Sequence, residues 1–120
     1  MNVQYLEIVT PDEAAVRQQY EAVHGLAFGE PDAGLGGART AELGDGAMIG
    51  IRGPMHAGEK PVVRPYVLVE DIAAAVKAAE EAGGTVAVPP MALPGHGTCA
   101  IVIQGEIECG LWQVAADSPA

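Results

Sequence analysis

A chain of 120 residues, 49% of them apolar, is long enough for one domain with a real core, although only one Trp, three Tyr and one Phe are available to fill it. Sixteen acidic residues against six basic ones give a formal net charge of -10, which argues against nucleic acid and membrane surfaces as partners. No apolar run is long enough to span a bilayer and no signal segment opens the chain, so we expect a cytoplasmic protein. In that compartment Cys99 and Cys109 are expected as thiols rather than as a disulfide.

The N-terminal segment predicts a strand followed by a helix. Residues 3–9 alternate in character and are rich in β-branched and aromatic side chains, which is typical of a strand. Thr10 as N-cap, Pro11 at the first helical position and Glu13 as the partner in a capping box predict a helix that begins here. Gly25 is expected to end that helix.

A glycine-rich stretch, 29–37, is too loose for a long regular element. Two short strands are then predicted, near 39–43 and 47–52, because the Gly-Asp-Gly of 44–46 between apolar runs favours a hairpin. Residues 54–63, with two prolines, a glycine and a histidine, are predicted to form a connector.

The second half predicts the same order of elements. Glu70 and Asp71 open its helix and Gly83-Gly84 ends it, while Pro89-Pro90 is expected to stop the strand that follows. The predicted elements are strands 64–69, 85–88, 98–103 and 107–114, a helix over 72–82, a loop over 91–97 and a frayed tail, 115–120.

The two halves align at an offset of 59 residues. This offset places Asp12 on Asp71 and Gly25 on Gly84, so both the start and the stop of the two helices coincide. Such a duplication indicates that neither half buries its apolar face alone. We therefore predict one α+β domain over 1–120, built from two βαβββ modules, module 1 at about 1–53 and module 2 at about 64–114.

The order and spacing of these elements resemble the vicinal oxygen chelate superfamily, which includes glyoxalases, bleomycin-resistance proteins and extradiol dioxygenases. The resemblance covers nearly the whole chain and is carried by residues 5–12, 64–71, 83–84, 89–90, 93–97 and 110–113. It implies that the two modules form a curved mixed sheet around a cup-shaped pocket for a small organic molecule. It also implies a homodimer, which would cover the open edges of the sheet.

Metal enzymes of this superfamily bind a divalent ion through four strands, usually with two His and two Glu. The four positions fall here on Tyr5, Gly50, Arg64 and Gly110. None of these is an ordinary metal ligand, and Arg64 would repel a cation. A register shift of two residues would bring Glu7 or Glu108 into the cup, and these are the only acidic candidates on the four strands. We therefore expect no catalytic metal and no cofactor.

Glu7 is the candidate catalytic residue, because an acid between Leu6 and Ile8 on a buried strand needs a partner or a ligand. It would act as an acid or base, or as a hydrogen-bonding group, on the same face as Tyr5. The alternatives are a salt bridge to Arg52 or Arg64, or exposure on the outer face of the sheet.

The candidate ligand-binding residues are large or polar side chains predicted to line the cup. His96 is included because the loop 94–97 caps the cup in related proteins, and His56 is a weaker candidate of the same kind. The full set is Tyr5, Met48, Arg64, Tyr66, His96 and Trp112.

Three functions follow from the resemblance. The first is a metal-independent binding protein that holds a mostly apolar molecule for sequestration or resistance. The second is a lyase, isomerase or dioxygenase that uses a displaced metal site or acid–base chemistry at Glu7. The third is a structural dimer without a ligand, which a filled cup would favour.

Overall fold

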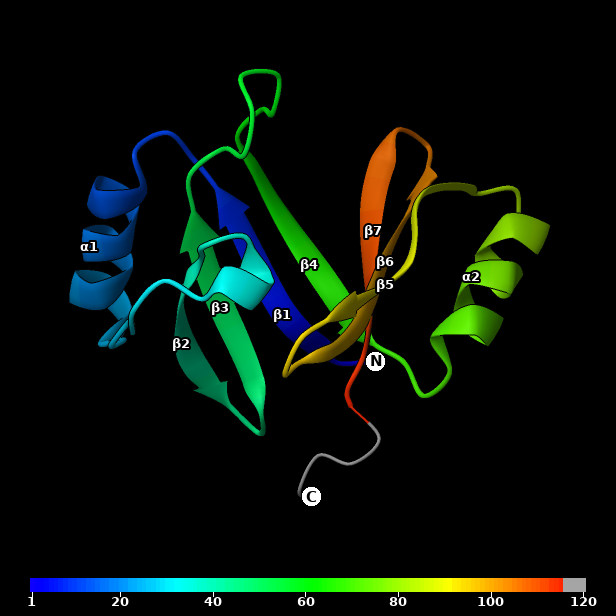
Figure 1. Cartoon of the computed structure of the whole chain (residues 1–120), viewed down its shortest axis with the longest axis horizontal. Coiled ribbons are helices and arrows are strands. Elements are labelled where there is room, and N and C mark those ends of the chain that lie inside the picture. The colour runs from blue at the N-terminus through cyan, green and yellow to red at the C-terminus, as the bar shows by residue number, and fades with distance from the viewer. Residues whose placement is uncertain (116–120) are drawn as a thin grey trace. The chain divides into compact units, whose positions relative to one another are not determined.

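The computed structural model describes residues 1–115, so the predicted tail lies outside the described residues except for Ala115. The chain divides into two compact units. We call residues 5–63 the first module, and residues 1–4 with the chain from Arg64 onward the second module (Figure 1). Each carries one α-helix and its own strands, as the repeat predicts. The boundaries therefore fall inside two strands, after Gln4 and after Val63.

The first module has the strand order β2-β3-β1, with β1 at Val3–Val9, β2 at Arg39–Gly44 and β3 at Ala47–Arg52. Strand β1 runs parallel to β3, with Tyr5 opposite Met48 and Glu7 opposite Gly50, and β2 is antiparallel to β3. The β2–β3 turn places Asp45 at φ 52° and Gly46 at φ 81°, as a type I′ hairpin requires, so the predicted hairpin is confirmed.

Helix α1, Glu13–His24, ends at Gly25 as predicted, but its start differs from the prediction. Asp12 is the N-cap and makes no side-chain cap bond, while the Thr10 hydroxyl accepts a hydrogen bond from the Asp12 N–H at 3.1 Å. Glu13 bonds Arg17 at 2.7 Å and does not close a capping box. The turn at Thr10–Asp12 therefore delays the helix to Glu13.

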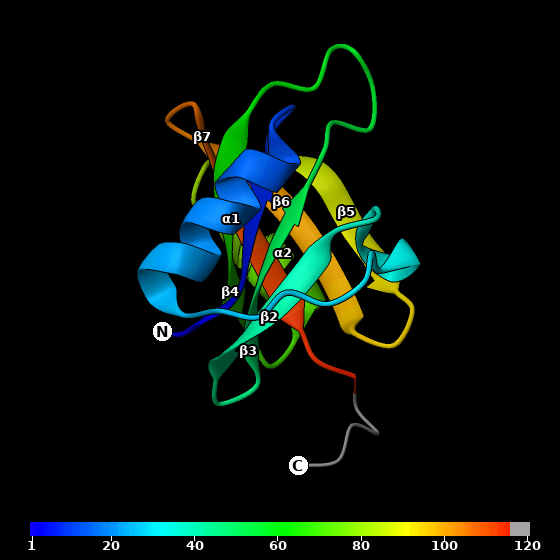
Figure 2. The same ribbon diagram turned by 90° about the vertical axis from the view of Figure 1, so that its left-hand side faces the viewer.

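The core of the first module lies between α1 and its strands (Figure 2). Ile8 and Ile51 are buried there, and Val16 and Tyr20 of α1 pack against them. Because side chains alternate along a strand, Tyr5 and Glu7 point to the opposite face of the sheet. Between α1 and β2 the chain forms only a 3₁₀ turn, η1 at Ala33–Leu35, and an isolated bridge from Asp32 to Ala38.

The second module has the strand order β4-β7-β6-β5 and forms the complete strand–helix–three-strand unit. Strand β4 is parallel to β7, and the other two pairs are antiparallel. The Asp71 carboxylate caps α2 by accepting from the Ala74 N–H at 3.1 Å, as the sequence predicts for this helix start. Its bounds are β4 Val62–Leu68, α2 Ile72–Glu81, β5 Thr85–Leu93, β6 Gly97–Gln104 and β7 Ile107–Gln113.

Two predicted boundaries in this half are wrong. Strand β4 begins at Val62, two residues earlier than expected. Strand β5 continues through Pro89-Pro90 to Leu93, so the predicted loop is reduced to a tight turn in which the His96 N–H bonds the Leu93 carbonyl at 2.8 Å. The prolines are tolerated because β5 ends the strand order of its module and its register with β6 is irregular there.

Within residues 1–115 no helix is long and apolar enough to cross a membrane. Cys99 is buried, Cys109 is exposed, and neither forms a disulfide, as predicted.

Candidate functional site

The inner face of the first module, defined as the face of its sheet opposite α1, is filled by Tyr5. A Cβ added to Gly50 would lie 1.8 Å from the Tyr5 hydroxyl oxygen and 2.5 Å from its Cζ, so the phenol ring occupies the space of a side chain at position 50. Burial, and secondarily the charge of Glu7, raise the pKa of the Tyr5 hydroxyl above its usual range. Tyr5 therefore stands as a neutral phenol at the place to which the sequence resemblance assigns the first two ligand positions.

Glu7 pairs with Arg52 on the same face. The Arg52 Nε donates to Glu7 Oε2 at 3.0 Å, and both side chains are buried, at 3% and 9% exposed. Of the alternatives considered for Glu7, the salt bridge to Arg52 is thus the one that the structure contains. The catalytic role of Glu7 stays a prediction.

A second carboxylate completes this group. Both terminal nitrogens of Arg52 donate to Glu59, each at 2.8 Å, in a bidentate pair, and the Met55 N–H donates to Glu59 Oε1 at 2.7 Å. The hydrogen bond from Arg52 lowers the pKa of Glu59 to about 2. Glu59 belongs to the connector and was not predicted, because no periodicity or motif links position 59 to the end of a strand.

The second module repeats the packing of an aromatic ring on a glycine. Tyr66 lies directly opposite Gly110 in the β4–β7 register, and a Cβ added to Gly110 would lie 2.6 Å from the Tyr66 ring. The Arg64 Nε donates to Glu108 Oε1 at 2.6 Å, with Arg64 buried and the Glu108 side chain 40% exposed. Each acidic candidate on the strands is therefore bound by an arginine of its own module.

Three predicted ligand-binding residues form an aromatic cluster in the second module. The rings of Tyr66 and Trp112 meet edge to face with centroids 5.7 Å apart, and His96 meets Trp112 at 6.4 Å. Tyr66 and Trp112 are almost fully buried, at 6% and 2% exposed, whereas His96 is half-buried. The accessible part of this cluster is thus His96, held by the turn between β5 and β6.

The remaining candidates are more dispersed. Met48 is half-buried beside Tyr5 on the inner face of the first module, and His56 is exposed in the connector. Across residues 1–115, no three His, Cys, Asp or Glu side chains are grouped so that they could hold a metal ion.

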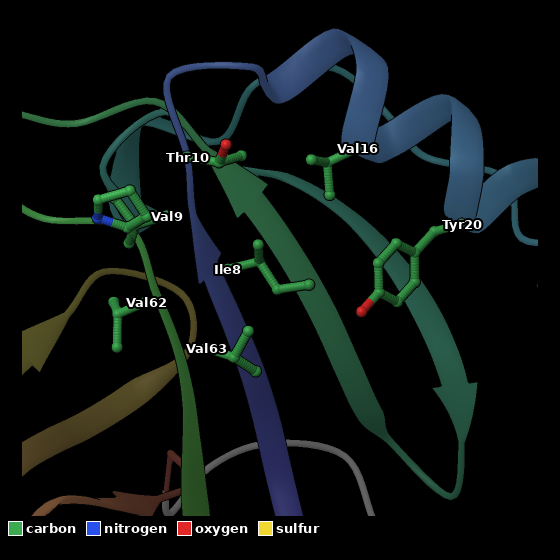
Figure 3. A pocket seen from close by; sticks show the side chains of 8 residues that line it. Ile8, Val9, Thr10, Val16, Tyr20, Val62 and Val63 are labelled. Atoms are coloured by element: carbon green, nitrogen blue, oxygen red, sulfur yellow. The ribbon is translucent and has the colours of Figure 1, made fainter.

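On the helix side of the first module, a groove of about 380 Å³ opens between α1 and the connector. Ile8 and Val63 from the strands and Val16 and Tyr20 from α1 point into it (Figure 3). The sequence patterns did not predict this groove. The run Pro61-Val62-Val63 at the end of a polar connector is the only signal that could have indicated it.

No family model matches the chain, and no curated protein matches it in sequence. Solved structures match it over nearly its whole length. A hypothetical protein, BH1468, from Bacillus halodurans C-125 superposes with a TM-score of 0.74 at 14% identity, covering 99% of this chain and 98% of that one.

Methylmalonyl-CoA epimerase from Mycobacterium tuberculosis matches with a TM-score of 0.70 at 15% identity, covering 94% of this chain and 87% of that one. A Streptomyces coelicolor methylmalonyl-CoA epimerase matches with a TM-score of 0.70 at 16% identity, covering 97% and 99%. At sequence identities this low, the structural similarity shows that the fold is shared and does not extend to the activity. The chain has the fold of the vicinal oxygen chelate superfamily, as the sequence resemblance predicted.

Proposed function

We propose that this chain is a small-molecule-binding protein of the glyoxalase and bleomycin-resistance type, that it works without a metal ion, and that its ligand is mostly apolar. Its task would be sequestration or resistance, in which tight holding of a molecule is the whole activity.

One observation carries the metal-independent part of this proposal. At both positions where the superfamily's metal enzymes carry a carboxylate, this chain has a glycine with a tyrosine ring packed on it, Tyr5 on Gly50 and Tyr66 on Gly110. A carboxylate side chain cannot be accommodated at either position unless the ring moves. The two acids nearest to these positions are already bound by arginines.

The fold and two half-buried side chains support the proposal that the chain binds a small molecule. Among the proteins of similar fold, methylmalonyl-CoA epimerases have been solved with 2-nitronate-propionyl-CoA and with methylmalonyl-CoA, so this architecture holds small organic molecules. In this chain the half-buried Met48 and His96 offer polarisable or aromatic surface, which suits an apolar ligand with few polar groups.

The test is a thermal-shift screen of EDTA-dialysed protein against neutral, mostly apolar compounds. A true ligand at 100 times its Kd stabilises the folded chain by about 2.7 kcal/mol, which raises the melting temperature by several degrees. We expect affinities that do not change when Zn²⁺ or Mn²⁺ is added, and that fall in His96→Ala or Met48→Ala. His24→Ala, at the exposed end of α1, is the matched control. Binding that requires a metal would contradict the proposal, and a screen without any hit would favour a structural dimer.

A further inference from the structure

The groove on the helix side of the first module is a separate cavity from the inner face. Its volume, about 380 Å³, falls within the range of roughly 300–1,000 Å³ that small-molecule sites occupy. Six of its eight lining residues are aliphatic or proline, and the other two, Thr10 and Tyr20, carry hydroxyl groups. Because Ile8 alternates with Glu7 along β1, the groove opens on the opposite face of the sheet from the Glu7–Arg52 pair.

The groove exists because α1 packs shallowly. No residue of α1 is fully buried, and its Val16 and Tyr20 are only half-buried against the strands. The repeated helix of the second module, α2, buries Ile72 and Val76 in its own core. The first module therefore leaves part of its apolar surface uncovered, whereas in the second module the corresponding surface is covered by α2.

The outer wall of the groove is held in place by the connector. Pro61 and Val63 form this wall, and Glu59, two residues before Pro61, is fixed by its bidentate pair with the buried Arg52. Between Gly53 and Glu59 the backbone makes one turn bond, from the Glu59 N–H to the His56 carbonyl at 3.1 Å. The Arg52–Glu59 pair therefore tethers the connector just before it leads into this wall.

The lining specifies the chemistry of an occupant. It contains no charged side chain, although the chain carries sixteen acidic residues, so the groove selects neither cations nor anions. The Thr10 hydroxyl already accepts from the Asp12 N–H. The Tyr20 hydroxyl points from α1 toward the strands (Figure 3) and makes no hydrogen bond within residues 1–115. It is available to donate to one acceptor on a ligand.

We propose that this groove is a second binding site, for a small, neutral, mostly apolar molecule with one hydrogen-bond acceptor directed at Tyr20, and that the tethered connector forms its wall. The occupant is a small molecule rather than a protein segment because the eight lining residues are uncharged, the volume of the groove is that of a small-molecule site, and the Tyr20 hydroxyl offers a single hydrogen-bond donor.

The test uses the neutral fluorophore 6-propionyl-2-dimethylaminonaphthalene, whose ketone is an acceptor and whose emission shifts to the blue in an apolar site. We expect saturable binding to the wild-type protein. Val63→Trp should fill the groove and weaken binding at least tenfold, because Val63 is 59% exposed and tolerates a larger side chain. Val23→Trp is the matched control, since Val23 lies on α1, is 65% exposed and does not line the groove. Tyr20→Phe should weaken binding by about two- to tenfold, the effect of one neutral hydrogen bond.

Methyl NMR locates the bound fluorophore. The proposal requires shifts at Ile8, Val16 and Val63 with none at Val86 of the second module. Absence of saturable binding, or equal binding by Val63→Trp and Val23→Trp, would overturn it. A dimer in sedimentation that Val63→Trp alone dissociates would also overturn it, because a second copy would then occupy the groove.

Discussion

The phenol ring of Tyr5 and the Cα of Gly50 are packed so closely that no side chain fits between them: an added Cβ would lie 1.8 Å from the Tyr5 hydroxyl oxygen. Tyr66 and Gly110 repeat the relationship in the second module, at 2.6 Å from the ring. In each module a tyrosine ring thus occupies the space at a glycine to which the sequence resemblance assigns a carboxylate ligand.

Gly50→Ala tests this packing. We expect it to lower the free energy of unfolding by about 2–3 kcal/mol, because the methyl group overpacks a buried site. Chemical denaturation measures the loss, with Gly29→Ala as the control, since a Cβ at Gly29 meets nothing within 4 Å. In a Tyr5→Ala background the cost of Gly50→Ala should fall below about 0.5 kcal/mol. An equal cost in both backgrounds would show that the ring is not the obstacle.

Glu59 is expected to make stability depend on pH in the acid range. Its pKa is lowered from 4.5 to about 2, so its contribution is fully present above pH 4.5 and is lost as the pH falls toward 2. Glu59→Gln should cost about 1.5–3 kcal/mol at pH 7, the value of hydrogen bonds to a charged group. The difference between wild type and variant should shrink from pH 4.5 to pH 2. Glu42→Gln, at an exposed position, is the control, and a difference that stays constant over this range would contradict the assignment.

The two repeated helices should respond differently to loss of the aspartate at their start. Asp71→Ala removes a carboxylate that accepts from the Ala74 N–H, and we expect a loss of about 1 kcal/mol. Asp12→Ala removes no cap bond and should cost less than about 0.5 kcal/mol. Thermal unfolding of both variants decides the matter, and equal losses would mean that capping is not the source of the effect.

Much of this fold follows from local signals in the sequence. The Asp45-Gly46 hairpin, the Gly25 helix stop and the Asp71 cap depend on residues adjacent in the chain, and all three are found as predicted. The predicted strand ends too early, before Pro89-Pro90, whereas β5 continues past them. The sequence does not reveal that β5 lies at the end of its module's strand order, where proline is tolerated.

The candidate site was only partly predictable. Glycines at positions 50 and 110 indicated that a carboxylate was missing, but only the side-chain packing of the folded chain shows that Tyr5 and Tyr66 fill the vacated space. The Arg52–Glu59 pair could not be foreseen, because it joins a strand to an irregular connector by a contact that leaves no periodic pattern.

Glu7→Gln separates holding a ligand from turning it over. A neutral amide keeps the size of the side chain but loses the charge that pairs with Arg52, so stability should fall by about 1.5–3 kcal/mol. For a binding protein in which Glu7 orients the ligand, the affinity for a ligand found by screening should weaken. Loss of turnover of that ligand, with its affinity intact, would instead identify Glu7 as a catalytic residue.

The central claim, binding without a metal, is tested most directly by the metal content of purified, untagged protein after incubation with Zn²⁺, Mn²⁺, Fe²⁺ and Ni²⁺ and desalting. We predict that less than about a tenth of an equivalent of any metal stays bound, where a real site would hold about one. Close to one equivalent of a single metal would contradict the account. It would mean that the chain holds a metal ion despite the packing of Tyr5 on Gly50 and of Tyr66 on Gly110.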